Sequence, residues 1–554
     1  MINKNVMMSN KKTISLVILF LCLFNTISAQ DFFKDKRKEW FEKAEKFKPS
    51  LIELVKHPVS LVTVVKDEKA FQGWRIQPEN PLDSLYGKSF KNKSGAIIDF
   101  GEHLTGHFSF SVKSISGTPD APLRFKLTFG EVPSELVTSF DPYPGTLSRA
   151  WLQDETVTLT LIPNTYILPR RIACRYVKIE LLGSSQYFDF EISNIEFKAV
   201  SSVDKLPVVL GPNTDPIIKK IDKISLKTLQ ECMQTVYEDG PKRDQRLWIG
   251  DLYLESIANS ITFKNFELTR RCLYLLAALS DDQGYLHSNV FERPTPHAQA
   301  NAHLIDYALL YNLALKEYFL ATNDKETCND LWPVAKRQIE IALGYVDKDG
   351  IFNIDAEPGW WMFFDWKDEL NKQASMQGLT INVLKETYEL AVSLGKESEV
   401  DHFKTTIEKM TKEARNRFYN KKTGLVVSGP NNQISVASQV WMILGGVLSQ
   451  KEGQAALNQI INMKGSVVYP GTPYLYHYFI QALLNCKMNN EARELIVSYW
   501  GRMVEKGADT FWEAFDPEND FLSPYNFYPV NSYCHAWSCT PTYFIRKYPE
   551  IFQK

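Results

Sequence analysis

The chain has 554 residues, of which 44% are hydrophobic and 23% charged, as in ordinary globular proteins of several domains. The formal net charge is -2 and no strongly basic run is present, which argues against nucleic acid or an anionic membrane surface as a partner. Aromatic residues reach 13%, and their faces can fill cores or stack on sugars.

Residues 1–29 are predicted to be a signal peptide. Lysines precede an apolar run over residues 14–24, and the small residues Ser28 and Ala29 follow it. The run is too short to span a membrane. We therefore predict export to the periplasm, with no membrane association once the signal is removed.

The cysteines predict neither a metal site nor a cofactor. Seven of the eight lie beyond residue 29, and none of these forms a C-x-x-C pair. We expect mostly buried free thiols, with a Cys534–Cys539 disulfide as the alternative.

The next two segments differ in hydrophobic period. Residues 30–57 form a charged amphipathic stretch around Trp40 and are predicted to be helical. Residues 58–203 alternate with period two in at least seven short runs separated by turn residues, which predicts a β-sandwich of the jelly-roll type. These runs are 62–65, 96–100, 107–112, 123–129, 157–162, 176–182 and 188–197.

A Pro/Gly segment at 207–212 marks the start of a helical domain over residues 204–554. About twelve helix-patterned segments follow, and longer loops come after alternate helices. This pairing predicts six helical hairpins closed into an (α/α)6 barrel. The long loops would then meet at one end and form a single site. They are 236–250, 281–299, 346–372, 418–433, 464–472 and 506–535.

The first long loop contains the most unusual stretch, Asp239-Gly-Pro-Lys-Arg-Asp-Gln-Arg-Leu-Trp-Ile-Gly-Asp251. Three carboxylates, three cations and Trp248 cannot be packed into an ordinary core, because each buried unpaired charge costs several kcal/mol. We interpret the stretch as the polar floor of a pocket. The alternative is an Asp/Arg network that only ties two helices together.

Two later loops bring further aromatic and acidic residues. In one, Trp360, Trp361 and Trp366 surround Asp365, a combination that suits a sugar through stacking and hydroxyl hydrogen bonds. A hydrophobic plug over the barrel mouth is the alternative. The other loop holds Thr510-Phe-Trp-Glu513, where an acid beside tryptophan favours a perturbed pKa, followed by His535-Ala-Trp537.

These motifs resemble those of bacterial α-L-rhamnosidases of glycoside hydrolase family 78. That family carries a signature close to D-C-P-Q-R-D-E-R-L-G-W-T-G-D, then T-x-W-E-R and N-H-Y/W-A-x-G, which correspond here to 239–251, 510–513 and 534–538. Its D-F-G and G-E elements correspond to 99–101 and 130–131. The resemblance covers roughly residues 60 to 547.

The resemblance implies a hydrolase that releases terminal α-L-rhamnose by inverting acid/base catalysis. Together with the predicted signal peptide, we expect an exported enzyme that acts on an oligosaccharide or polysaccharide of plant or algal origin. Glu513 would be the general base that activates water. The sugar would be bound by Asp239, Arg243, Asp251 and His535, with Trp248, Trp537 and the 360–366 cluster walling its apolar face.

One departure concerns the general acid. The family's acid is the Glu after R-D, where this chain has Gln245, and an amide has no acidic proton to give. The motif is also one residue shorter. We predict that Asp244 takes over as the acid, with Asp251 or Glu238 as alternatives, and that Gln245 hydrogen-bonds the sugar.

Other functions remain open from the sequence. The chain could bind rhamnose-containing glycans without hydrolysing them. A hydrolase or lyase acting on a uronate-containing glycan would use basic residues such as His297, His303 and Tyr307. Lys242, Arg243 and Arg246 would suit a sulfate or uronate neighbour of the sugar. No oligomeric state follows from the sequence.

Overall fold

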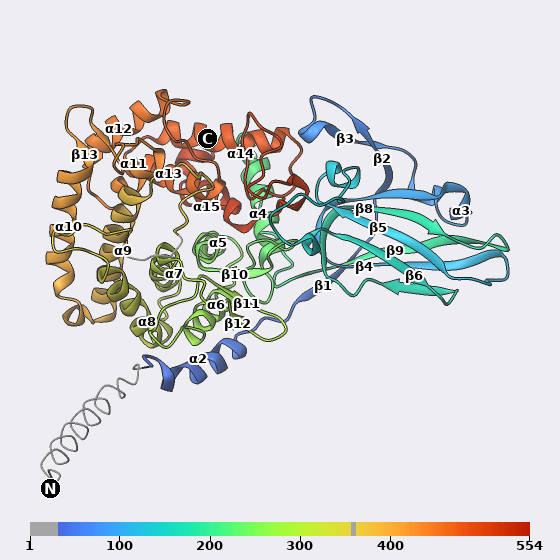
Figure 1. The fold of residues 1–554 in the computed structure, drawn as a ribbon, viewed down its shortest axis with the longest axis horizontal. Coiled ribbons are helices and arrows are strands. Elements are labelled where there is room, and N and C mark those ends of the chain that lie inside the picture. The colour runs from blue at the N-terminus through green and yellow to red at the C-terminus, as the bar shows by residue number, and fades with distance from the viewer. Residues whose placement is uncertain (1–30, 356–361) are drawn as a thin grey trace, which may run out of the picture.

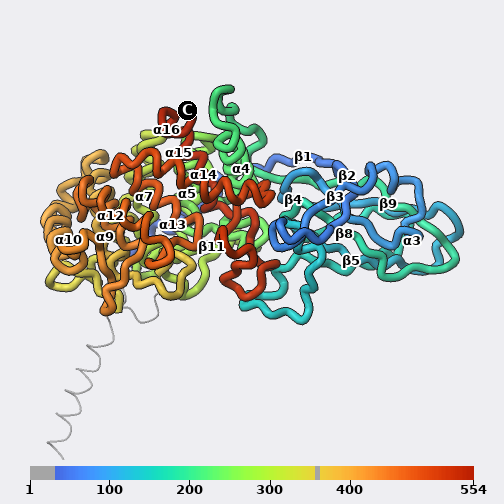
Figure 2. The backbone as a smooth tube through the Cα atoms, turned by 90° about the horizontal axis from the view of Figure 1, so that it is seen from above, coloured from blue at the N-terminus to red at the C-terminus, as the bar shows by residue number. Residues whose placement is uncertain are grey.

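The computed structural model describes residues 31–355 and 362–554. Figure 1 shows a strand-rich domain beside a larger helical domain, with helix α2 (Lys34–Lys46) against the helical one. Figure 2, turned by 90°, shows the same division. The predicted signal peptide, Trp360 and Trp361 lie outside the described residues.

The segment predicted as helical over 30–57 is only partly so. Helix α2 (Lys34–Lys46) buries Trp40 completely and packs against α6 (Phe266–Ala278) of the helical domain. Beyond it, β1 (Ile52–Lys56) pairs antiparallel with β9. The prediction was wrong for 52–56, because this largely exposed edge strand lacks the regular alternation that marks a half-buried strand.

The strand-rich domain is one nine-stranded antiparallel sheet that folds over on itself. Its central path runs β1-β9-β4-β8-β5-β6, while β2 pairs with β3 and β4, and β7 pairs with β4. The strands after β1 are β2 (Ser60–Lys66), β3 (Trp74–Pro78), β4 (Gly95–Gly117), β5 (Leu123–Gly130), β6 (Asp154–Leu159), β7 (Asn164–Ile167), β8 (Ile172–Gly183) and β9 (Phe188–Ser201).

The long strand β4 connects the two halves of the sheet. It pairs with β8 along its first part and β9 along its second, and its register shifts between Asp99 and Leu104. A bulge of this kind bends a strand. Side chains such as Phe108, Phe125 and Phe190 fill the core between the halves. The sandwich prediction is confirmed, while the short strands β3 and β7 were not predicted.

The helical domain contains the predicted hairpins. Its inner helices are α5 (Ile249–Ile261), α7 (Ile305–Thr322), α9 (Gln373–Leu394), α11 (Val436–Leu444), α13 (Pro473–Asn485) and α15 (Pro541–Lys547). Its outer helices are α4 (Pro216–Cys232), α6, α8 (Lys325–Leu343), α10 (His402–Phe418), α12 (Gln450–Asn462) and α14 (Asn489–Glu505), and α16 (Pro549–Phe552) ends the chain.

The inner helices close into a ring. Contacts run from α5 to α7, α9, α11 and α13 in turn, and the short helix η7 (Ala536–Cys539) and α15 complete the circuit back to α5. Inner helices are buried nearly all round, as α7 and α13 show, because the outer helices cover them. The (α/α)6 barrel is thus confirmed.

Two of the long loops pair with each other, which the sequence did not predict. A small antiparallel sheet joins β10 (Arg246–Trp248), β11 (Asn289–Phe291) and β12 (His297–Ala298). It fixes the charged stretch against the second loop by main-chain hydrogen bonds.

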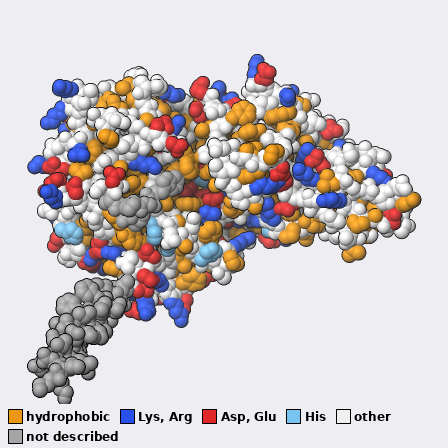
Figure 3. Space-filling model, in the orientation of Figure 1, with side chains coloured by type: hydrophobic (Ala, Val, Ile, Leu, Met, Phe, Trp, Pro, Cys, Tyr) orange, Lys and Arg blue, Asp and Glu red, His pale blue; other side chains and the backbone are white. Residues whose placement is uncertain are grey.

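The seven cysteines beyond the predicted signal peptide are buried free thiols. Within the described ranges, no helix combines the length and apolarity needed to cross a membrane. Acidic and basic side chains are interspersed over the face seen in Figure 3, in line with the net charge of -2.

Candidate active site

A cavity of about 170 Å³ lies at the N-terminal ends of the inner helices. Asp251 stands in the first turn of α5, Tyr307 in the first turn of α7, and His535 and Trp537 immediately before α15. Three of the six predicted long loops, 236–250, 346–372 and 506–535, supply lining residues at this end of the barrel. The lining residues are Leu147, Asp239, Arg243, Asp244, Trp248, Asp251, Leu304, Tyr307, Phe363, Trp366, Glu513, Tyr525, His535 and Trp537.

The charged stretch is a tight loop organised by Asp239. Its carboxylate accepts hydrogen bonds from the backbone N–H groups of Asp244 at 3.2 Å and Arg246 at 3.1 Å. The peptide bond between Arg243 and Asp244 is cis, and Gln245 has a φ of +61°. The Asp244 side chain faces the cavity, whereas the Gln245 amide donates to the carbonyl oxygen of Pro241 at 2.7 Å.

Contrary to the prediction that Gln245 hydrogen-bonds the sugar, its side chain does not line the cavity. It is not among the described lining residues, because its side chain is used inside the loop. Asp244, the predicted replacement acid, does line the cavity. Its side chain is 16% exposed, more than the 3% of Glu513, so it is the more accessible of the two.

Glu513 is held in the ionised form on the opposite side of Arg243. The guanidinium donates to Glu513, the Tyr525 hydroxyl donates to its other oxygen, and the Trp537 indole donates to its carbonyl oxygen at 2.9 Å. Burial would raise the pKa of Glu513, but Arg243, His535 and Tyr525 outweigh burial and hold it below its usual value. A buried carboxylate that stays ionised can accept a proton from water.

Arg243 joins the two candidate catalytic carboxyl groups. One terminal nitrogen, Nη2, contacts Glu513, and the other, Nη1, lies 3.5 Å from Oδ1 of Asp244. Asp244 and Glu513 are thus separated by the width of a guanidinium group and its two contacts. Because the guanidinium also donates to the carbonyl oxygen of Val530 at 3.0 Å, its position is fixed.

The remaining polar lining residues are buried as well. Burial, followed by the nearby charge of Asp244, raises the pKa of Asp239 to about 8. Burial also raises the pKa of Asp251, whose Oδ1 lies 3.5 Å from Nε2 of His535. Burial would lower the pKa of His535, but Asp251 and Glu513 outweigh it and raise it. Neither ring nitrogen of the buried His535 makes a hydrogen bond to the described residues.

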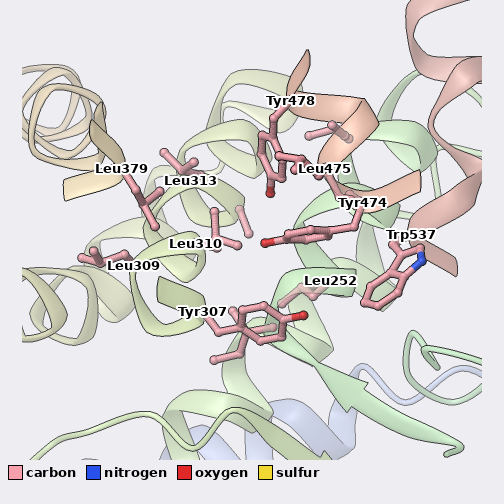
Figure 4. Packing of buried hydrophobic residues seen from close by; sticks show 14 of the residues in the cluster. Leu252, Tyr307, Leu309, Leu310, Leu313, Leu379, Tyr474, Leu475, Tyr478 and Trp537 are labelled. Atoms are coloured by element: carbon pink, nitrogen blue, oxygen red, sulfur yellow. The ribbon is translucent and has the colours of Figure 1, made fainter. Parts of the chain in front are cut away.

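Aromatic side chains form the apolar walls. Phe363 stacks on Trp537 with ring centroids 5.4 Å apart, and its backbone N–H donates to Asp306 at 2.9 Å. Figure 4 shows Trp537, Tyr307 and Tyr474 among the leucines of the barrel core. A cavity lined by carboxyl groups and aromatic side chains can hold a single sugar ring.

Of the other residues predicted for the site, Trp366 lines the cavity, whereas Asp365 and Glu238 do not. Asp365 accepts hydrogen bonds from Thr472 Oγ1 at 2.6 Å and the Gly471 N–H at 2.7 Å, so it anchors a loop rather than lining the cavity. Its neighbour Trp366 does line the cavity. Glu238, an alternative acid, is bound to Arg171 at 2.6 Å and is also absent from the described lining.

The interpretation of Lys242 as an anion-binding residue was wrong. Its ammonium group is buried between Glu135 at 2.6 Å and Glu131 at 3.0 Å, both from the strand-rich domain. Arg246 lies 3.6 Å from Asp244 and stacks over Phe291.

The residues considered for a lyase are dispersed. His297 is exposed and contacts the carbonyl oxygen of Thr295, and His303 contacts that of Leu286. Only Tyr307 of the three lines the cavity. Within the described part of the chain, no group of three His, Cys, Asp or Glu side chains could hold a metal ion.

Sequence reasoning missed several lining residues. Tyr525 lies in the predicted loop 506–535, but nothing in its local pattern marks it. Leu147 belongs to the strand-rich domain, so only the three-dimensional arrangement of the domains brings it to the barrel. Leu304 and Phe363 look like ordinary core residues in sequence.

Helical hairpins around a cavity with paired carboxyl groups and aromatic walls define the class of six-hairpin glycosidases. Comparison with protein families matches residues 58–199 to the glycosyl hydrolase family 78 α-rhamnosidase N-terminal domain and residues 213–548 to the bacterial α-L-rhamnosidase six-hairpin glycosidase domain. The chain belongs to this rhamnosidase family. A comparison with curated proteins found no match.

Solved structures agree with this assignment. A rhamnosidase from Klebsiella oxytoca with rhamnose bound is 39% identical, with a TM-score of 0.88 over 92% of this chain and 99% of that one. A family 78 rhamnosidase of Bacillus sp. GL1 shares the fold at 20% identity and a TM-score of 0.67, over 81% of this chain and 46% of that one. An α-L-rhamnosidase from Streptomyces avermitilis complexed with L-rhamnose shares it at 16% identity and 0.62, over 90% and 44%.

Proposed function

We propose that the protein is an exported α-L-rhamnosidase that releases terminal rhamnose from plant or algal oligosaccharides with inversion at the anomeric carbon. The pair Asp244 and Glu513 on either side of Arg243 is the observation that carries this proposal. Inverting glycosidases hold their two carboxyl groups about 6.5–9.5 Å apart, so that a water fits between the base and the sugar.

The roles follow from the environment of each group. Glu513 is ionised and takes a proton from the attacking water. Asp244 is the more accessible of the two carboxyl groups and gives a proton to the departing glycosidic oxygen. Asp239, Asp251 and His535 bind the sugar hydroxyls, while Trp248, Trp366 and Trp537 contact its apolar face.

Proton NMR of the first product tests the proposal. Hydrolysis of an α-L-rhamnoside should release β-L-rhamnose before mutarotation, and Glu513→Gln should reduce kcat at least about a hundredfold. Release of the α-anomer would contradict inversion, and undiminished activity of Glu513→Gln would remove the assigned base. Saturable binding of rhamnose without any turnover would favour a glycan-binding protein instead.

A further inference from the structure

A loop of the strand-rich domain reaches into the active site. Between β5 and β6, residues 138–151 cross to the barrel, where the Thr146 N–H donates to the carbonyl oxygen of Tyr525 at 3.0 Å. Thr138 Oγ1 lies 2.6 Å from the Tyr528 hydroxyl. These contacts place Leu147 in the lining of the same cavity as Asp244 and Glu513.

The cavity is large enough for one sugar ring only. Its volume of about 170 Å³ is below the roughly 300–1,000 Å³ of pockets that enclose drug-sized ligands. The unit attached to the terminal sugar must therefore leave through the mouth. Asp244, the proposed acid, has to reach the bond between the two units, so the leaving unit passes beside Asp244 and the neighbouring lining residues.

Apolar groups dominate the loop side of the mouth. Leu147 packs against the cluster of Phe140, Leu152, Tyr525 and Val530. Tyr143 of the same loop meets Phe527 edge to face at 5.5 Å. An apolar sugar face or an aromatic ring can rest on such a surface, whereas a charged group would lose hydration there without compensation.

The nearby charges also disfavour an anionic leaving unit. Among the described lining residues, four are carboxylic acids and only Arg243 and His535 are basic. Arg243 is already bound to Glu513, and His535 lies next to Asp251. Lys242 and Arg246 are likewise engaged by carboxylates, so no cation of the 239–251 stretch is left for a sulfate or a uronate.

We infer that Leu147 forms one wall of an acceptor subsite that takes an uncharged leaving unit with an apolar face and discriminates against a uronate or sulfated unit. This inference rests on the proposed function. It extends the proposed active site to a residue of the strand-rich domain. It assigns substrate selection to a residue outside the barrel.

Two disaccharides with the same linkage test the inference: α-L-rhamnose on glucose, and α-L-rhamnose on glucuronate. The native protein should have a kcat/KM at least about tenfold higher for the glucose compound, and Leu147→Lys should reduce that ratio about tenfold by placing a cation at the mouth. Leu161→Lys is the matched control, because Leu161 is 73% exposed on the strand-rich domain. It should leave the ratio unchanged.

Leu147→Ala removes the wall without adding charge and should raise KM for the glucose disaccharide at least about threefold. The thermal midpoint of each variant shows that it is folded. Three results would overturn the inference. They are a native kcat/KM for the glucose disaccharide no higher than for the glucuronate disaccharide, an unchanged ratio of these two values in a folded Leu147→Lys, and an unchanged KM in Leu147→Ala.

Hydrolysis of 4-nitrophenyl α-L-rhamnoside separates this inference from the proposed function. If the native protein cleaves that compound but does not prefer the uncharged disaccharide, only the acceptor subsite is wrong. If it cleaves none of the three compounds, the proposed function and the inference both fail.

Discussion

Asp244 and Gln245 are neighbours in the chain, but their side chains point to different places. Gln245 closes the loop through Pro241, while Asp244 faces the cavity beside Arg243. The amide at the position where the family has an acid is therefore compatible with a hydrolase. In this loop the neighbouring carboxyl group of Asp244 lines the cavity, and the Gln245 amide does not.

The raised pKa of Asp239 predicts that activity declines at alkaline pH. Its pKa of about 8 means that it carries a proton at neutral pH and loses it as the pH rises. Ionisation would add a negative charge beside Asp244 and Asp251. We expect kcat/KM to fall above about pH 8, and this decline to shift or disappear in Asp239→Asn, whose overall activity is lower.

The pH profile of kcat/KM measured for both proteins checks this prediction. The same decline, at the same pH, in native protein and variant would show that another group causes it.

At the scale of elements, the site depends on how the loops are held. The loop 239–246 is paired to β11 through β10 and tied to the strand-rich domain through Lys242. Glu131 connects both halves of the site, because it also accepts a hydrogen bond from the Tyr533 N–H at 2.8 Å, two residues before His535. Glu131 thus positions the loops of Asp244 and His535 relative to each other.

Lys242→Met should therefore affect stability and catalysis together. It leaves the buried Glu135 without its cation and Glu131 with His103 alone, and removing one partner of a buried pair costs about 3–5 kcal/mol. We expect a lower free energy of unfolding in chemical denaturation and a lower kcat.

Lys198→Met is the control, because Lys198 pairs with Glu53 at 3.2 Å on the surface, where both side chains are about half exposed. Its cost should stay below about 1 kcal/mol. Equal stability of the two variants would show that the buried pair has no special role.

At the scale of the whole molecule, the two domains form one functional unit. The strand-rich domain supplies Leu147 to the cavity, Glu131 and Glu135 to Lys242, and Arg171 to Glu238. A chain reduced to residues 204–554 would leave these partners without their contacts. We expect it to lose at least about a hundredfold in kcat/KM, since small displacements of catalytic groups are that costly.

Activity and far-ultraviolet circular dichroism of the shortened chain, set beside those of the intact protein, check this expectation. A folded barrel with full activity would show that the strand-rich domain has no part in positioning the site.

Hydrophobic period was enough to predict the sandwich, the hairpins and the end of the barrel where the loops meet. It was enough because apolar residues alternate along the sequence of strands such as β5 and recur at helical spacing on outer helices such as α10. The strand over 52–56 was missed because an edge strand is exposed on both faces. The places of Lys242, Asp365 and Leu147 depend on partners more than a hundred residues away, which no local pattern contains.

The most direct test of the central assignment compares two leaving groups in Asp244→Ala. A general acid matters for a poor leaving group such as an alcohol, and little for one that departs as a stable anion. We expect kcat/KM to fall at least about a thousandfold for a rhamnosyl disaccharide but less than about tenfold for 2,4-dinitrophenyl α-L-rhamnoside. Gln245→Ala removes only a loop contact and should change kcat/KM by the same factor for both substrates. Equal losses on the two substrates in Asp244→Ala, or a selective loss in Gln245→Ala, would contradict the assignment of Asp244 as the acid.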